Sequence, residues 1–268
     1  MRAWLTREWR RLCDDLRENN GAPALDARTT AVFCISTVLL TIFYYYGKAN
    51  YFRGSDIEAW VLGLGVPWVT RNATMLPYVY WGLSSLVIRV LIPLAVIVWA
   101  FRESPADYGL TWKGQAKHVP TYAGLYLFML PFLIWMAHVP SFQQAYPFWD
   151  DAPHSGTRFW VYEGFYALQF IGVEFFFRGF VLFALFRKFG YHALLIVAIP
   201  YVMIHFNKPI PETLGALVAG IVLGYLALRA KSCVLGIVLH TGIAVTMDVL
   251  AMAQHHDGVA GALRSVLP

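Results

Sequence analysis

The chain has 268 residues, of which 58% are hydrophobic and 14% are charged, and its formal net charge is +5. A soluble domain carries about 25% charged residues, so this composition excludes an ordinary water-soluble protein and predicts a membrane protein. The positive residues lie at the ends of apolar segments, which argues against a nucleic-acid-binding face. Three cysteines are too few and too dispersed for a disulfide framework.

The first 28 residues are more polar than the rest of the chain. Large apolar side chains recur in this segment at helical spacing: Trp4, Leu5, Trp9, Leu12 and Leu16. Arginines occupy positions between them, and such a helix binds an anionic membrane surface. We therefore expect residues 1–28 to form a cytoplasmic amphipathic leader that anchors the chain on the inner leaflet.

Apolar runs then follow in series. A membrane-spanning helix needs about 20 mainly apolar residues. Seven runs reach or approach this length: 29–47, 76–101, 118–139, 158–187, 191–206, 212–230 and 232–254. The segment 57–69 is too short to span and is expected to be interfacial or re-entrant, although an eighth span is the alternative. The predicted fold class is all-α, a polytopic membrane helix bundle with seven to eight transmembrane helices.

Lysine and arginine predict the orientation of the bundle. With the N-terminus in the cytoplasm, 13 of them fall on the inner side and six on the outer side. This asymmetry follows the positive-inside rule and predicts a multi-pass protein of the cell (inner) membrane with a cytoplasmic N-terminus. Beyond the leader we expect N-terminal transmembrane helices at 29–157, a functional core at 158–255 and a short C-terminal tail at 256–268.

Two ionisable residues interrupt the apolar sequence "VEFFFRGF". Glu174 and Arg178 are four residues apart, so they share one helix face and can form an ion pair. An ionisable group near the bilayer centre costs at least ~2.5 kcal/mol, so it needs a partner or a cavity. A purely structural pair is one explanation. Arg89, alone within its span, is expected to pair with an acid on a neighbouring helix.

Two histidines on other spans favour a functional explanation. His205 ends the fifth span and His240 lies inside the seventh. Imidazole ligates metals and stabilises oxyanions, and a carboxylate acts as a base, so these groups together can bind or activate a water molecule. Counted from the basic inner boundaries, Glu174 and His205 lie about 20–25 Å deep but His240 only about 14 Å deep. Helix tilt or an offset start must bring His240 level with the others.

These residues resemble the CPBP family of intramembrane proteases, which includes the type II CAAX prenyl endopeptidases. That family has EExxxR on one helix, an aromatic residue followed by histidine on a later helix, and HxxxN or similar on a last one. The matching segments here are "EFFFR", "YVMIH" and "HTGIA", in the same order, and the resemblance extends over roughly residues 160–255. It implies an intramembrane endopeptidase, a hydrolase of a kind often labelled a metalloprotease.

Two positions depart from the family pattern. The first glutamate, which is taken as the base that activates water, is Val173 here, and the asparagine expected as an oxyanion donor is Ala244. Glu174 corresponds to the second glutamate, which usually pairs with the arginine. The resemblance therefore implies the scaffold and both histidines, and it leaves the base and the oxyanion donor open.

The candidate site follows from these patterns. Three residues are expected to be catalytic: Glu174, His205 and His240. Four are expected to support them: Arg178, Tyr201, Glu212 and Asp248. Glu212 is either a first-turn acid favoured by the helix dipole or a second carboxylate near His205, and Asp248 either orients an imidazole or caps its helix. We expect no obligatory cofactor, and zinc on His205 and His240 is the alternative.

The leading hypothesis is an endopeptidase that uses activated water to cleave a membrane-anchored or exported protein near its C-terminal membrane segment. Its expected partners are a membrane-protein or lipidated-protein substrate and the lipid bilayer, with no nucleic acid. The alternative is a catalytically silent relative that binds membrane proteins as a chaperone or immunity-type partner, which would suit Val173 and Ala244. An ion-coupled transporter is a third hypothesis, but no inverted repeat is evident.

Overall fold

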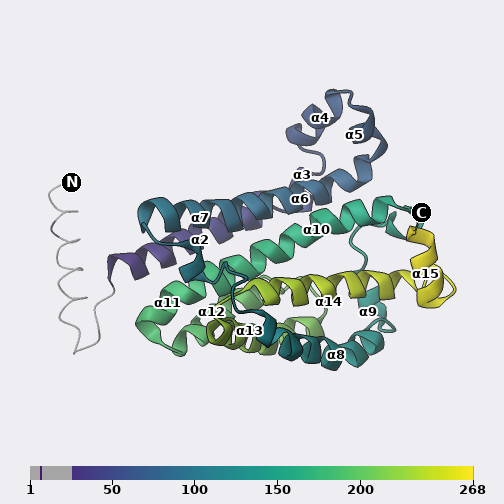
Figure 1. Ribbon diagram of the computed structural model, residues 1–268. Coiled ribbons are helices and arrows are strands. Elements are labelled where there is room, and N and C mark those ends of the chain that lie inside the picture. The colour runs from purple at the N-terminus through teal and green to yellow at the C-terminus, as the bar shows by residue number, and fades with distance from the viewer. Residues whose placement is uncertain (1–6, 8–25, 268) are drawn as a thin grey trace.

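The computed structural model describes residue 7 and residues 26–267, and every regular element in that part of the chain is a helix (Figure 1). Six helical runs are long and apolar enough to cross a membrane: Ala27–Tyr46, Ala73–Ala100, Ala116–Met136, Arg158–Phe189, Ile210–Ala230 and Val234–Met252. His192–Met203 is a shorter apolar helix. The all-α, polytopic architecture is therefore confirmed, while the amphipathic leader falls almost wholly outside the described residues.

The N-terminal half contributes three of the long runs. They comprise α2 (Ala27–Tyr46), the continuous series α6 (Leu76–Leu86), η2 (Val87–Leu91), α7 (Ile92–Ala95) and η3 (Val96–Ala100), and α8 (Val119–Met136). Two short helices begin the second and third of these runs: η1 (Ala73–Met75) and η5 (Ala116–His118). Other short helices lie outside the runs: α3 (Ala49–Phe52), α4 (Asp56–Gly63), α5 (Pro67–Arg71), η4 (Pro105–Tyr108), α9 (Pro140–Gln143) and η6 (Ala152–His154). Because segment 57–69 is divided between α4 and α5, it does not form an eighth span.

The C-terminal half contains the helices that carry the predicted core. They are α10 (Arg158–Glu174), η7 (Phe175–Val181), α11 (Leu182–Phe189), α12 (His192–Met203), α13 (Ile210–Ala230), α14 (Val234–Met252) and α15 (Gly258–Val266). The first three form one continuous run, with a π-helical segment in the middle. The expected C-terminal tail contains α15, which packs against α14.

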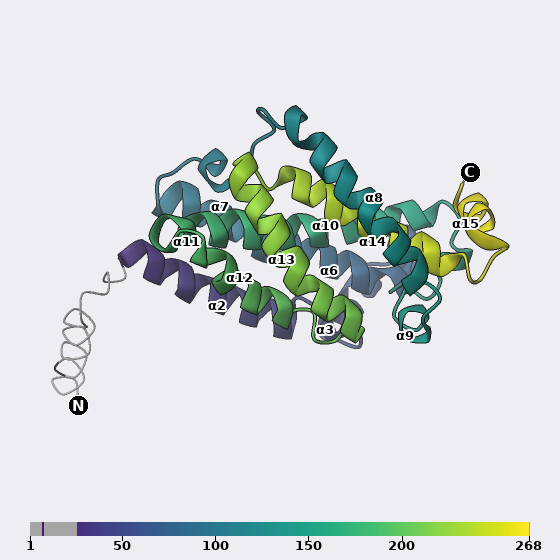
Figure 2. The ribbon, with the colours of Figure 1, turned by 90° about the horizontal axis from the view of Figure 1, so that it is seen from below.

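The run from α10 to α11 is the centre of the bundle. It is mostly buried, whereas less than half of each of the other five long runs is buried. In Figure 1, α10 lies between α6 and α14, and both helices pack against it. Figure 2 shows α12 and α13 side by side, and α8 against α14. A central helix surrounded in this way can hold charged side chains away from lipid.

Small residues let the central run approach its neighbour closely. A Cβ atom at Gly82 of α6 would lie 2.3 Å from the backbone oxygen of Phe165 in α10. A Cβ atom at Gly172 of α10 would lie 2.2 Å from the hydroxyl of Ser85 in α6. Both distances are shorter than any ordinary contact. The obstacle at Gly82 is backbone, so glycine is needed there, and at Gly172 the serine hydroxyl would have to move. This is the close packing through small residues that membrane helices use in place of a hydrophobic driving force.

Arg89 lies in the same region, and the prediction of an acidic partner is wrong. Its side chain is buried, and its Nη1 donates a hydrogen bond to Oε1 of Gln169 at 3.3 Å. Its guanidinium carbon lies 3.5 Å from the centre of the Phe43 ring. An amide oxygen and an aromatic face thus take the place of the carboxylate, and the attraction of a cation to a ring strengthens when both are desolvated.

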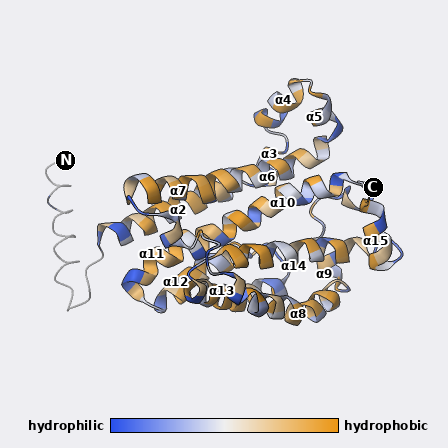
Figure 3. Cartoon of the chain, viewed as in Figure 1, coloured by the Kyte–Doolittle hydropathy of each residue, from blue (hydrophilic) through white to orange (hydrophobic). Residues whose placement is uncertain are grey.

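Apolar residues predominate along most of the long helices, as the orange colour of the chain in Figure 3 shows. Large apolar side chains are exposed on several spans, among them Trp99, Phe128, Ile199 and Val218. A soluble protein rarely exposes apolar surface on this scale. The surface therefore fits a lipid bilayer, as the composition predicts.

Candidate functional site

Residues from three elements of the core meet at the Glu174 carboxylate. Its Oε1 lies 3.1 Å from Nη1 of Arg178, and the same oxygen is 2.8 Å from Nδ1 of His240. Glu174 ends α10, Arg178 lies in η7 and His240 belongs to α14. The ion pair predicted from the four-residue spacing is present, and the packing of α14 against α10 brings His240 level with Glu174.

This hydrogen bond determines which nitrogen of His240 carries a proton. An ionised carboxylate only accepts hydrogen bonds, so Nδ1 of His240 must donate. In the neutral imidazole, Nε2 then has a free lone pair. The side chain of His240 is 18% exposed and that of Glu174 only 1%. The imidazole, rather than the carboxylate, is therefore the group that a reactant can reach.

His205 is held in a similar way from the other side of the site. It follows α12, and its Nδ1 lies 2.8 Å from the backbone oxygen of Tyr201, which can only accept. The ring of Tyr201 packs on His205 and also on Arg178, whose guanidinium carbon is 3.7 Å from the ring centre. His205 also interacts electrostatically with Glu174 and His240. Nε2 of His205 is thus a second imidazole nitrogen with a free lone pair.

Two residues missed in the sequence shape the space around the carboxylate. A Cβ atom at Gly236, one turn before His240, would lie 3.0 Å from Oε2 of Glu174. The ring of Phe170, one turn before Glu174, packs on His240 with 4.7 Å between ring centres. The approach of Gly236 to the carboxylate depends on the distance between α10 and α14, so its spacing from His240 alone did not reveal it. Nothing in the apolar surroundings of Phe170 distinguished it in advance.

Glu212 belongs to a neighbouring ionic group. Its carboxylate pairs with Nζ of Lys208 at 3.2 Å and accepts from the hydroxyl of Tyr146 at 2.9 Å on each oxygen. Lys208 also donates to the hydroxyl of Tyr146. The next residue, Thr213, donates to the backbone oxygen of His205 at 2.7 Å. Glu212 therefore lies near His205 in the fold, while its carboxylate is engaged by Lys208 and Tyr146.

Asp248 forms part of a third polar group, two turns beyond His240 on α14. It is fully buried, and its Oδ2 accepts a hydrogen bond from the hydroxyl of Tyr162 at 3.1 Å. Glu163, also buried, lies close to Asp248, but neither of its carboxyl oxygens has a hydrogen-bond partner among the described residues. The donor to Asp248 is thus a tyrosine of α10, and the geometry gives Asp248 a place between α10 and α14 rather than beside an imidazole.

The two positions that depart from the family pattern are packed in apolar clusters. Val173 is buried together with phenylalanines of η7, among them Phe176 and Phe177. Ala244 is buried among aromatic side chains that include Tyr162 and Tyr166. Each side chain therefore contributes packing at a point where the family pattern has a polar group.

The histidines of the site offer few ligands to a metal ion. Within the described part of the chain, no group of three or more His, Cys, Asp or Glu side chains is placed to hold one. His205 and His240 each donate Nδ1–H to an oxygen, which is the arrangement that leaves Nε2 available to a metal. Two such nitrogens are fewer than the three protein ligands usual in a catalytic zinc site.

Comparison with known proteins agrees with the motif pattern. The family model described as type II CAAX prenyl endopeptidase Rce1-like matches residues 155–246, which include Glu174, Arg178, His205 and His240. This match confirms the resemblance to the CPBP family over that segment. Searches of the curated proteins and of the solved structures found no match.

Proposed function

We propose that this chain, whose residues 155–246 fall in the Rce1-like type II CAAX prenyl endopeptidase family, is an intramembrane endopeptidase. The observation that carries the proposal is the hydrogen bond from His240 to a Glu174 oxygen that Arg178 also contacts. A buried carboxylate that orients an imidazole leaves the other ring nitrogen poised as a general base. The structural-pair explanation accounts for Arg178 but gives no role to a partly exposed imidazole.

In the proposed reaction, Nε2 of His240 takes a proton from water as the water oxygen attacks the carbonyl carbon of the substrate peptide bond. Glu174 holds the imidazole in the required tautomer and stabilises the imidazolium that forms. The proton then passes from His240 to the nitrogen of the leaving amine, and the C–N bond breaks. Because Glu174 is buried and its Oε1 is already engaged, we assign it to orientation rather than to direct proton abstraction.

His205 has a complementary role in this proposal. Its Nδ1–H is used by the backbone oxygen of Tyr201, so its Nε2 offers a second acceptor. A water molecule that donates one hydrogen to each histidine has its oxygen lone pairs directed away from both. Such orientation of the nucleophile is worth several orders of magnitude in rate when the geometry is correct.

The substrate class follows from the membrane setting. We infer a membrane-anchored or exported protein that is cleaved near its C-terminal membrane segment. The excess of Lys and Arg on one side of the spans supports a cytoplasmic N-terminus and the cell (inner) membrane. The apolar outer surface supports a substrate that reaches the site from the bilayer.

A catalytically silent, substrate-binding relative is the second candidate. The observation in its favour is that Val173 and Ala244 are packed in apolar clusters, so neither position offers a polar group to the reaction. Such a protein would keep the Glu174–Arg178 pair for stability. It would bind a transmembrane partner without changing the partner's covalent structure.

Membrane proteomes distinguish the two candidates. Cells with the parental protein, without it, and with the variant His240→Ala would be compared by mass spectrometry of protein C-termini. A protease predicts shorter C-termini that depend on the parental protein and are absent with His240→Ala. A silent partner predicts identical C-termini in all three, with only the abundance of a partner protein changed.

Metal analysis tests the expectation that no cofactor is obligatory. We expect the purified protein to contain zinc well below one atom per chain, and activity to survive dialysis against a chelator. Stoichiometric zinc that disappears in both His205→Ala and His240→Ala would contradict this expectation. It would instead make the two Nε2 atoms metal ligands.

A further inference from the structure

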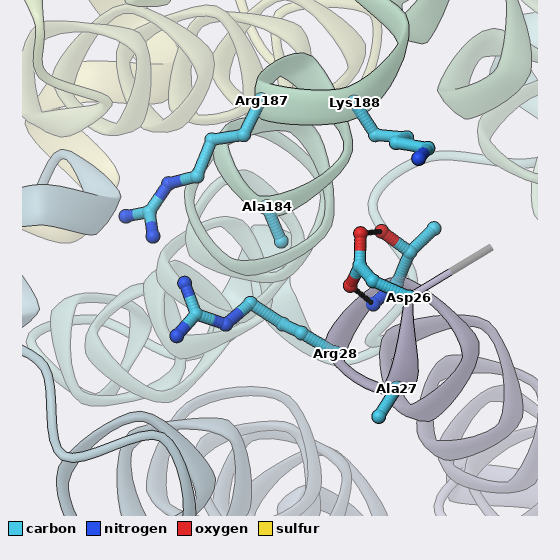
Figure 4. A pocket seen from close by; sticks show the side chains of 7 residues that line it. Asp26, Ala27, Arg28, Ala184, Arg187 and Lys188 are labelled. Atoms are coloured by element: carbon cyan, nitrogen blue, oxygen red, sulfur yellow. Dashed lines mark hydrogen bonds between the residues drawn. The ribbon is translucent and has the colours of Figure 1, made fainter. Parts of the chain in front are cut away.

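A second site lies away from the Glu174 group, where α2 begins and α11 ends. There the protein surface has an open cavity of about 410 Å³, whose lining side chains are drawn in Figure 4. Its lining includes three cationic side chains, Arg28, Arg187 and Lys188, and two small apolar ones, Ala27 and Ala184. Two of the membrane-spanning runs end at this point, so the cavity lies at the boundary between the bilayer and water.

The two arginines are held together by one carboxylate. Nη1 of Arg28 and Nη1 of Arg187 lie 2.7 Å and 2.6 Å from the same oxygen of Glu103. The hydroxyl of Tyr108 donates to the other oxygen of Glu103 at 2.6 Å. A guanidinium has five N–H donors, so one carboxylate shared between two leaves most of these donors unused by Glu103. Both arginine side chains are nearly 40% exposed and hence accessible.

The acids near the cavity are already engaged. Asp26 accepts hydrogen bonds from the backbone N–H and the hydroxyl of Thr29, at 2.8 Å and 3.0 Å, and so caps α2. Figure 4 shows these two bonds as dashed lines, with the ends of Arg28 and Arg187 close to each other on another side of the cavity. Among the described residues, three cations and two carboxylates give this site a net positive charge.

We propose that this cavity binds the phosphate group of an anionic membrane lipid. A guanidinium group can donate two parallel hydrogen bonds to a phosphate group. The guanidinium groups of Arg28 and Arg187 lie close to each other here. The first turn of α2 adds the positive end of a helix dipole. The volume lies within the range of small-molecule sites. The location at the ends of two spans favours a lipid phosphate over a free phosphate ion, and the alanines leave room for the glycerol part.

Native mass spectrometry of the full purified chain with added phosphatidylglycerol tests this site. The parental protein should retain phosphatidylglycerol in preference to phosphatidylcholine. The variant Arg187→Gln/Lys188→Gln should lose about fivefold in affinity for each positive charge removed. The matched control Lys113→Gln/Lys117→Gln removes two exposed charges outside the cavity and should bind like the parental protein. Equal retention by all three proteins would overturn the proposal.

A variant that should bind lipid more tightly distinguishes an effect on the lipid site from a loss of folding. Glu103→Gln frees both guanidinium groups from their shared carboxylate, so it should bind phosphatidylglycerol several-fold more tightly. Weaker binding by a folded Glu103→Gln protein would count against the proposal. Competition by inorganic phosphate identifies the source of the ligand: we expect millimolar phosphate to displace little lipid. Displacement at concentrations equal to that of the lipid would overturn the assignment to a lipid.

Discussion

Among single residues, Glu174 is the one that joins the parts of the site. Oε1 of Glu174 is approached by a guanidinium from its own helical run and by an imidazole from α14. If Glu174 and Arg178 served only to neutralise each other's charge, they would not need a third group such as the His240 imidazole. The addition of a partly exposed histidine converts a charge-neutralising pair into a device that fixes a tautomer.

Glu174→Gln should therefore lower the cleavage rate by at least about 100-fold, because the amide no longer enforces an Nδ1–H tautomer or stabilises an imidazolium. The same change leaves the buried Arg178 unpaired, which can cost about 3–5 kcal/mol of stability. Cleavage in proteoliposomes and thermal unfolding in detergent should be measured on the same preparation. A folded variant with parental activity would contradict the role of Glu174 in orienting His240.

Glu163→Gln is the matched control for that experiment. Glu163 is also a buried acid of α10, but it lies with Asp248 rather than with His240. We expect this variant to keep the parental rate within about threefold, since buried carboxyl pairs away from the reacting atoms act mainly on stability. An equal loss of activity in both variants would mean that any buried acid in α10 supports the fold rather than the chemistry.

The sequence predicted one contact of the site, the Glu174–Arg178 pair, but not the contacts made between helices. The spacing of Glu174 and Arg178 specified their pair, because residues four apart on a helix are always neighbours. The partner of Arg89 depends on how η2, α2 and α10 are rotated about their axes, and no spacing rule contains that information. The close approach of Gly236 to Glu174 likewise depends on the distance between two helices.

At the scale of elements, the spans were predictable because lipid requires long apolar runs. The six long helices lie where the hydropathy of the sequence placed them. The fifth predicted span, 191–206, is realised as the 12-residue helix α12, which is about 18 Å long and therefore shorter than the bilayer core. His205 consequently lies in the turn after the helix, where its side chain is less constrained by helical geometry.

Helix packing at the site can be tested through a glycine. Gly236→Ala places a Cβ atom 3.0 Å from Oε2 of Glu174, so the carboxylate must shift by a few tenths of an ångström. We expect about a tenfold loss of activity, because small misplacements of catalytic groups are costly. The control is Gly215→Ala on α13, where nothing lies within 4 Å; it should keep its activity and gain up to about 1 kcal/mol in stability. Parental activity in Gly236→Ala would show that the carboxylate position is not critical.

The ionic contacts of Glu103, near the start of α2 and the end of α11, predict that the free energy of unfolding decreases in acid. Burial alone would raise the pKa of Glu103, but hydrogen bonds from Tyr108 and Arg187 and the charge of Arg28 lower it below the ordinary 4.5. A lowered pKa contributes stability above the ordinary value, and that stability is lost as the pH falls through the folded value. Because the arginines are partly exposed, the loss should be about 1 kcal/mol or less. The free energy of unfolding in detergent should change less between neutral and acidic pH in Glu103→Gln than in the parental protein. The same change in both proteins would contradict a stabilising role of the ionised Glu103.

At the scale of the whole molecule, the bundle is arranged around one buried run. The segment from α10 to α11 carries Glu174 and Arg178 and is shielded from lipid by α6, α12 and α14. That arrangement lets a membrane protein keep an ion pair and two histidines within its apolar thickness. We propose that this interior performs hydrolysis with His240 as the base.

Cleavage in water enriched in oxygen-18 tests that claim most directly. The purified protein would be reconstituted with a native membrane fraction as the source of substrates, and new C-termini would be read by mass spectrometry. We predict new C-termini that each contain one oxygen-18 atom, formed by the parental protein and by Glu163→Gln but lost in His240→Ala. New labelled termini that His240→Ala forms at the parental rate, or no new termini from the parental protein, would contradict the account.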